Sequence, residues 1–217
     1  MTIQLPPQEP PFWNAYLHQI PFCVELSRNF PLIQQEIVAF IESSHPFMDY
    51  PKYANLYINT WEAFPLSKFQ GEFVELSKKN LSFDLERIVA YARNRLPTLS
   101  ALIAPLEAQG HLRNVFVSRL LPGSIINPHR GWTPDFLRVH IGLRCDPYCR
   151  ITVGSETQTW SEGQLLAFKD GGPYSHSVRH DGTHGRIVLA IDLTLRYVNQ
   201  FIPGIDSPSS VAKAGGA

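Results

Sequence analysis

LRVHIGL, residues 137–143, alternates apolar side chains with Arg138, His140 and a glycine on the opposite face. This period of two is typical of a β-strand. RIVLAID, residues 186–192, alternates in the same way. Further short strands are predicted at 115–121, 150–153, 158–160 and 165–168, between turns that contain glycine or proline. Short strands at such spacing indicate a β-sandwich or a β-barrel.

The first half of the chain has a different pattern. LIQQEIVAFIES, residues 32–43, repeats apolar side chains at helical spacing, and a proline precedes it. A second helix is predicted behind Ser82 as its N-cap, with a buried stripe in residues 85–92. A further helical segment is predicted at 99–106, and a short strand at 22–26.

The order of these patterns, helices first and strands second, predicts the organisation of the chain. We expect one domain over residues 1–217, mainly β in class, with N-terminal helices packed against the sheet. Within it we expect a helical and aromatic-rich part at 1–110, a β core at 111–200 and a flexible tail at 205–217.

Composition excludes several classes of protein. The chain has 217 residues, of which 44% are hydrophobic and 18% charged, as in globular proteins. Lys+Arg and Asp+Glu are equal at 19 each, so no overall field attracts nucleic acid or an anionic membrane. No apolar run approaches the roughly 20 residues of a membrane span, and the start does not resemble a signal peptide. We therefore expect a cytoplasmic protein.

Two histidines stand at predicted strand ends. His129 lies where a strand meets a loop, and His176 ends the glycine turn DGGPYSH. Each alone can be an exposed loop histidine, but together they lie at the mouth of one β-domain, as in the iron site of a double-stranded β-helix (jelly roll, cupin-like). A facial triad would add a carboxylate two residues after the first histidine, where this chain has Gly131. Either water or an anion takes that position, or a carboxylate comes from elsewhere.

Two arginines fall in the predicted strands. Arg138 shares a strand face with His140, and an inward-facing arginine is costly unless it is paired. No acidic residue alternates beside it, so we expect an external carboxylate, which guanidinium binds with a bidentate fork. Arg186 has either the same role or an outward position at the start of its strand. Ser118 can donate a hydroxyl hydrogen bond to the same carboxylate.

Other polar residues have simpler interpretations. Cys145 and Cys149 are expected to be reduced thiols, because an odd cysteine count without a signal peptide argues against a disulfide framework. His180 and His184 lie in RHDGTHG and are expected in a solvated loop. The sequence lacks G-x-S-x-G, the P-loop and G-x-G-x-x-G.

Residues 113–195 resemble the aspartyl/asparaginyl β-hydroxylases, which are iron(II)- and 2-oxoglutarate-dependent oxygenases. Upstream, Trp61 and Phe64 resemble the family's Trp-x-x-Phe element. The spacings from Ser118 to His129, from His129 to Arg138 and from His176 to Arg186 fit the family pattern. The other matching residues are Pro122-Gly123, Gly131, His140, Gly142-Leu143, Thr159-Trp160, Glu162-Gly163, Phe168, Asp170 and Asp192.

The resemblance implies a function and a set of site residues. It implies a dioxygenase that uses Fe(II), 2-oxoglutarate and O₂ to hydroxylate an unactivated carbon. The expected substrate is the β-carbon of an aspartyl/asparaginyl-type or other amino-acid-derived compound, small, carrier-bound or within a peptide. Human-type members carry an arginine where this chain has Phe136. The residues implied are His129 and His176 for iron, Ser118, Arg138, His140 and Arg186 for 2-oxoglutarate, and Trp61 for the pocket wall.

Two alternatives remain open. A halogenase would use the open position at Gly131 for chloride. A non-catalytic cupin-type metal-binding protein would also use two histidines. The usual second histidine and the glutamate of the cupin motif are missing, however, and Arg138 and Arg186 would have no role in it.

Overall fold

The structure, a computed structural model, describes residues 9–50, 55–67 and 84–205. The helices are η1 (a 3-10 helix, Asn14–Gln19), α1 (Pro21–Arg28), α2 (Phe30–Ser44), α4 (Leu85–Arg93), α5 (Pro97–Ala108) and α6 (Leu195–Val198). The strands are β1 (Met48–Asp49), β2 (Tyr57–Ile58), β3 (Trp61–Pro65), β4 (Leu112–Leu120), β5 (Ile125–His129), β6 (Phe136–Arg144), β7 (Cys149–Val153), β8 (Glu156–Thr159), β9 (Leu165–Phe168), β10 (His176–His180) and β11 (Arg186–Thr194).

These strands form two antiparallel sheets. The larger sheet has the order β1-β3-β4-β11-β6-β9, and the smaller has the order β2-β5-β10-β7-β8. A hydrophobic cluster joins their facing sides, with Phe116 and Val188 from the larger sheet and Ile126, Ile151 and Val178 from the smaller. Two antiparallel sheets packed over a shared core are a jelly roll, which confirms the expected fold class.

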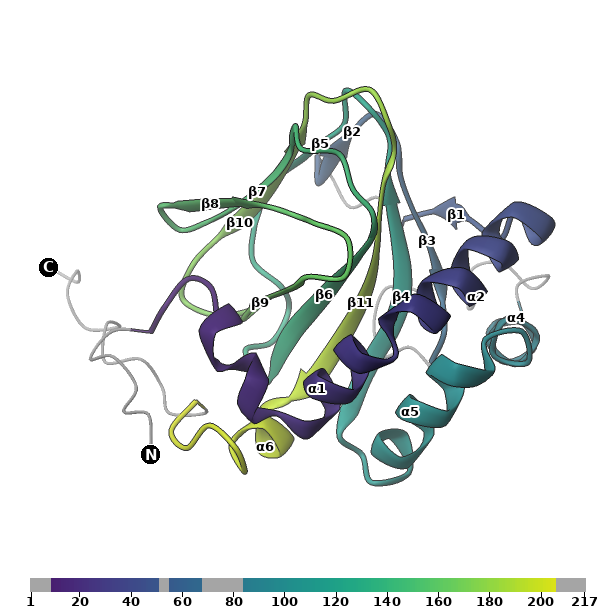
Figure 1. Cartoon of the computed structure of the whole chain (residues 1–217). Helices are drawn as coiled ribbons and strands as arrows, with labels where there is room; N and C mark the ends of the chain where they lie inside the picture. The colour runs from purple at the N-terminus through teal and green to yellow at the C-terminus, as the bar shows by residue number, and fades with distance from the viewer. Residues whose placement is uncertain (1–8, 51–54, 68–83, 206–217) are drawn as a thin grey trace, which may run out of the picture.

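The helices cover the other face of the larger sheet. Figure 1 shows α1, α2 and α5 lying across the sheet that contains β4, β6 and β11. Ile37 of α2 and Ile103 of α5 belong to the same buried cluster as Leu189 and Ile191 of β11. The intervening Val188 and Ala190 face the smaller sheet. The alternation predicted for β11 is therefore confirmed, and the residues that share parity with Arg186 point between the sheets.

One predicted strand is wrong. Residues 22–26 lie inside α1, which begins at Pro21, where a missing N–H leaves no helical hydrogen bond unmade. Phe22, Cys23 and Leu26 bury one face of this helix. A short apolar run does not distinguish a strand from a buried helical segment by periodicity alone.

The remaining boundaries need smaller corrections. The predicted helix at 99–106 is longer, since α5 already begins at Pro97. The cap of α4 is Asp84, whose carboxylate accepts the backbone N–H of Arg87 at 3.0 Å. Ser82 and the tail from residue 206 onward lie outside the described residues. Within the described part of the chain, no helix is long and apolar enough to cross a membrane.

Candidate active site

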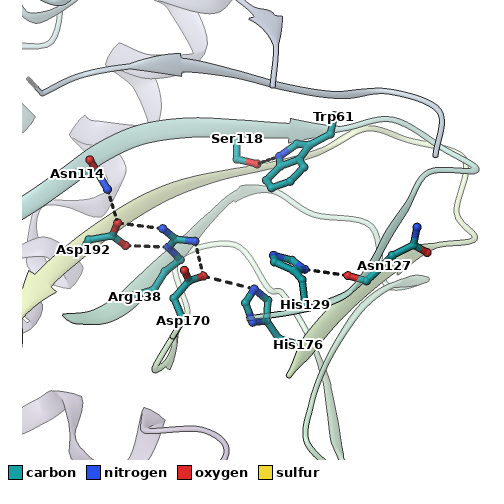
Figure 2. Close-up of polar contacts among 9 residues, drawn as sticks. All are labelled: Trp61, Asn114, Ser118, Asn127, His129, Arg138, Asp170, His176 and Asp192. Atoms are coloured by element: carbon teal, nitrogen blue, oxygen red, sulfur yellow. Dashed lines mark hydrogen bonds and ion pairs between the residues drawn. The ribbon is translucent and has the colours of Figure 1, made fainter. Parts of the chain in front are cut away.

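A cavity of about 40 Å³ lies between the two sheets. The larger sheet contributes Arg138 and Arg186, and the smaller sheet contributes His129 and His176. Figure 2 shows Arg138 and the two histidines. All seven site residues predicted from the sequence line this one cavity: Trp61, Ser118, His129, Arg138, His140, His176 and Arg186. The fold thus brings together residues that lie up to 125 positions apart (186 − 61) in the sequence.

The histidines face each other across neighbouring strands. His129 of β5 is the register partner of His176 of β10, and their ring centroids lie 4.2 Å apart. The Nδ1–H of His129 donates to the carbonyl of Asn127 at 2.8 Å, which leaves its Nε2 lone pair free. Burial, followed by the electrostatic effects of the neighbouring His129 and Arg138, holds the pKa of His176 well below its usual value. His176 is therefore neutral, which is the form that binds a metal.

A carboxylate occupies the space beside Gly131. A Cβ at this glycine would lie 1.8 Å from Oδ2 of Asp170, and the Gly131 N–H donates to the Asp170 carbonyl at 2.8 Å. Oδ1 of Asp170 lies 3.4 Å from Nε2 of His176. The position where a facial triad would place its carboxylate is thus next to a carboxylate from another loop. In the described residues, no three His, Cys, Asp or Glu side chains are grouped closely enough to hold a metal ion.

The expectation that Arg138 lacks an acidic partner within the protein is wrong, because two carboxylates reach it from other segments. Asp192 is its register partner on β11, and the two form a bidentate pair with N–O distances of 2.7 and 2.9 Å. Nη1 of Arg138 donates to Asp170, so the guanidinium lies between two carboxylates (Figure 2). Burial disfavours the charge, but Asp170 and Asp192 hold the pKa of Arg138 above its usual value. Two of its five N–H donors remain for another acceptor.

Arg186 is the contrasting case. It faces inward and is 2% exposed, so its predicted outward alternative is wrong. Its Nη1 lies 3.4 Å from Oγ of Ser118, and its Nε has no partner among the described residues. Burial lowers the pKa of Arg186, partly offset by Cys149. A buried guanidinium without a carboxylate is costly, so the cavity favours an anion beside it.

Known proteins similar to this chain are consistent with this geometry. A family model described as aspartyl/asparaginyl beta-hydroxylase matches residues 27–195. The chain belongs to the aspartyl/asparaginyl β-hydroxylase family. Aspartate beta-hydroxylase domain-containing protein 2 of Homo sapiens is 37% identical over 83 residues, which cover 37% of this chain and 22% of that protein. The aspartyl/asparaginyl beta-hydroxylase of Mus musculus is 37% identical over 73 residues, covering 33% and 10%.

This β-hydroxylase family member therefore spans about a fifth of the human relative's length. Among solved structures, a prolyl hydroxylase from Trichoplax adhaerens, in complex with a hypoxia inducible factor peptide, aligns with a TM-score of 0.48 at 10% identity. That alignment covers 78% of this chain and 80% of the other. A viral collagen prolyl hydroxylase from Paramecium Bursaria Chlorella virus-1 aligns with a TM-score of 0.35 at 9% identity, covering 47% and 71%.

Three residues of this β-hydroxylase site had no role assigned from the sequence. Asp192 pairs with Arg138, Asp170 fills the space beside Gly131, and Trp160 donates its Nε1–H to Nδ1 of His140 at 3.2 Å. The sequence could have indicated Asp192, because it shares parity with Arg186 in the same strand and therefore lies on the same face. Asp170 follows the end of β9, and Trp160 follows the end of β8 although it lay in the strand predicted at 158–160, so alternation assigned neither of them to the cavity.

The loop before Arg186 is also better packed than expected. His180 is 0% exposed, so the prediction of a solvated residue is wrong, whereas His184 is exposed as predicted. Nε2–H of His180 donates to the carbonyl of His184 at 2.7 Å. The buried Asp146 accepts the backbone N–H groups of Thr183 and His184 at 2.9 and 3.0 Å. These contacts fix the turn that leads into β11.

Asp146→Ala is expected to lower the melting temperature at neutral pH. The N–H groups of His184 and Tyr148 lower the pKa of Asp146. A carboxyl whose pKa is depressed by folding stabilises the protein above its unfolded pKa of about 4, and this contribution is lost as the pH falls. The difference in melting temperature between wild type and variant should therefore shrink in acid.

Asp181→Ala is the matched control for that measurement. Asp181 lies in the same loop but pairs on the surface with Arg150 and Arg179. Exposed pairs contribute little, so this variant should melt close to the wild type. A pH-independent difference between Asp146→Ala and wild type would contradict the role given to the carboxylate.

Proposed function

We propose that the protein is an iron(II)- and 2-oxoglutarate-dependent dioxygenase that hydroxylates an unactivated carbon of an amino-acid-derived substrate. One observation carries the proposal. The same cavity contains a facing pair of imidazoles, His129 and His176, and a buried guanidinium, Arg186, that lacks a carboxylate among the described residues. Membership of the β-hydroxylase family supports the same reaction class.

The histidine pair fits iron. His129 has its Nδ1–H held by a backbone carbonyl, and such a second contact orients a metal-binding imidazole. His176 is neutral, and its Nδ1 is buried with no hydrogen-bond partner in the described residues. Imidazole suits iron, so His129 and His176 are the residues that would hold it. Iron, 2-oxoglutarate and O₂ supply the oxidising chemistry when bound, while the protein binds and orients.

The guanidinium of Arg186 fits the far carboxylate of 2-oxoglutarate. Its partner Ser118 already accepts hydrogen bonds from Nε1 of Trp61 at 2.9 Å and from Arg186 at 3.4 Å. With its oxygen so occupied, the Ser118 hydroxyl can donate its proton to an incoming acceptor. The carboxylate would thus receive a charged donor and a neutral donor from adjacent strands. Arg138 keeps two N–H donors for the other end of the acid.

Asp170 argues against the halogenase alternative. That alternative needs an anion position beside Gly131, but the Asp170 carboxylate takes this space. A chloride there would lie against a like charge, which is unfavourable in a buried site. The cupin-type alternative leaves the buried Arg186 without a function. Hydroxylation therefore has more support than either alternative.

The proposed substrate is an amino-acid-derived compound. The family name suggests an aspartyl or asparaginyl side chain, free, carrier-bound or in a peptide. Phe136 is 3% exposed and is covered by Arg138 and Arg113, whose guanidinium carbons lie 5.4 and 5.3 Å from its ring centroid. Cytoplasmic location, a single domain and the absence of nucleic-acid and membrane partners stay predictions of the sequence.

His176→Ala and His129→Ala are each expected to abolish the formation of succinate from 2-oxoglutarate in the presence of Fe(II) and O₂. With only two histidine ligands proposed for iron, the loss of either one leaves a single ligand, which is too few to hold the metal. Mass spectrometry of succinate, with candidate amino acids screened for the gain of one oxygen, measures the effect. His184→Ala, which alters an exposed histidine, should retain wild-type turnover.

Two results would count against the proposal. The first is wild-type protein that turns over no 2-oxoglutarate above background, with His176→Ala changing nothing. The second is a product that gains chlorine rather than oxygen when chloride is present, which would favour the halogenase.

A further inference from the structure

Two indole N–H groups donate to two residues of the cavity wall, each of which can both donate and accept a hydrogen bond. Trp61 Nε1–H donates to Oγ of Ser118 at 2.9 Å, and Trp160 Nε1–H donates to Nδ1 of His140 at 3.2 Å. All four side chains are buried, with exposures between 3% and 8%. An indole N–H is a donor only, so it decides which role its partner takes.

The consequence for His140 is a fixed tautomer. Burial, followed by the charges of Arg138 and Arg186, holds the pKa of His140 well below its usual value, so the ring is neutral. A neutral imidazole has one N–H and one lone pair. Since Nδ1 accepts from Trp160, the proton is on Nε2. No hydrogen bond between described residues occupies that Nε2, and His140 lines the cavity.

By the same reasoning, Ser118 and Arg186 both have N–H or O–H groups free to donate into the cavity. Ser118 accepts from both Trp61 and Arg186, so its own proton is available. Nε–H of Arg186 is buried and has no partner in the described ranges. Its guanidinium carbon lies 4.7 Å from the ring centroid of Trp160, within cation–π range. Trp160 therefore contacts both the imidazole and the guanidinium.

We propose that Trp160 is a positioning residue for 2-oxoglutarate. Trp160 fixes His140 as its Nε2–H tautomer and packs against Arg186, so that both side chains present donors to the acid. This inference rests on the proposed function for its ligand. The assignment of the tautomer stands on the hydrogen bond alone. Trp160 touches neither the metal histidines nor, by this account, the acid itself.

Trp160→Phe tests the inference, because phenylalanine keeps a ring under Arg186 and removes only the N–H donor. Trp13→Phe is the matched control: Trp13 is buried, lies outside the cavity, and its Nε1 has no partner among the described residues. The full chain is examined by ¹⁵N NMR of the imidazole nitrogens and by calorimetric titration with 2-oxoglutarate in the presence of Mn(II). Thermal unfolding checks that each variant is folded.

We expect Trp160→Phe to give a mixture of His140 tautomers and to weaken 2-oxoglutarate binding severalfold, in proportion to the fraction of molecules that lose the Nε2–H donor. Trp13→Phe should leave both readouts unchanged. If Trp160→Phe keeps the pure Nε2–H tautomer and the wild-type affinity, the inference is overturned. If wild-type protein binds no 2-oxoglutarate, the proposed function fails, while the NMR result still decides the tautomer.

Two substitutions at His140 test the same arrangement from the other side. His140→Gln can accept from Trp160 with its carbonyl and donate into the cavity with its amide, so it should retain most of the affinity. His140→Leu can do neither and should lose at least tenfold. Equal affinities for these two variants would overturn the inference even if Trp160→Phe fails to fold.

Discussion

Arg186→Met is expected to weaken 2-oxoglutarate binding about a thousandfold, or ~4 kcal/mol, as for the loss of one partner of a buried ion pair. The guanidinium is 2% exposed and has no carboxylate partner among the described residues, so the acid would supply its missing counter-charge. Calorimetric titration in the presence of Mn(II) measures the loss. Arg186→Lys keeps a positive charge but not the planar guanidinium, so its affinity for 2-oxoglutarate should lie between those of the wild type and Arg186→Met.

The same substitution should raise the melting temperature of the ligand-free protein. A buried cation without a counter-charge costs free energy, and an apolar side chain of similar length removes that cost. Arg179→Met is the control, since Arg179 is exposed and pairs with Asp181 on the surface. Unchanged affinity in Arg186→Met, or a protein destabilised by it without a loss of binding, would contradict the role assigned to Arg186.

Gly131→Ala is expected to lower the free energy of unfolding by about 2 kcal/mol and to impair metal binding. A methyl group at this position would lie 1.8 Å from Oδ2 of Asp170, so the carboxylate must move away from Arg138 and His176. Denaturant unfolding and Fe(II) titration measure the two effects. Gly185→Ala is the control, because its nearest new contact is an ordinary 3.4 Å to Leu121.

A second substitution makes this prediction specific. In an Asp170→Gly background the obstructing carboxylate is absent and the nearest remaining atom is the backbone carbonyl carbon of residue 170 at 3.1 Å, so adding Gly131→Ala should cost much less stability than in the wild type. The two changes are therefore expected to be strongly non-additive in a double-mutant cycle. Additive losses would show that Asp170 is not what excludes a side chain at residue 131.

The sequence predicted the inner face of the sheet correctly because strand alternation has a period of two. Arg138 and His140 share parity within β6, so the pattern assigns them to one face. Arg186 shares parity with Val188 and Ala190 within β11, but the pattern also allowed an outward position at the start of that strand. The helices over residues 32–43 and 99–106 followed from apolar spacing in the same way. These features are local, and local patterns are visible in a single sequence.

The partners of Arg138 were missed because they are not local. Asp192 and Asp170 lie 54 and 32 residues away and reach the guanidinium only through strand register and loop packing. The sequence suggested an external carboxylate for Arg138 and, as one alternative, for Arg186, but Arg138 already has two carboxylate partners within the protein. It is Arg186 that remains without a carboxylate in the described structure, a distinction that alternation cannot make.

The segment at 22–26 failed for a different reason. Its apolar run is too short for periodicity to distinguish a strand from a helix, and Pro21 was not recognised as a helix start. His180 ends β10, where it is the register partner of Cys149 on β7, and this strand pairing is not visible in the local sequence. Neither error moved a predicted residue out of the cavity.

The most direct test of the central claim is a crystal structure of the protein soaked with Fe(II) and 2-oxoglutarate without oxygen. The account predicts iron bound by His129 and His176, with the far carboxylate of the acid on Arg186 and Ser118. Metal bound elsewhere, or an acid whose carboxylates avoid Arg186, would contradict it.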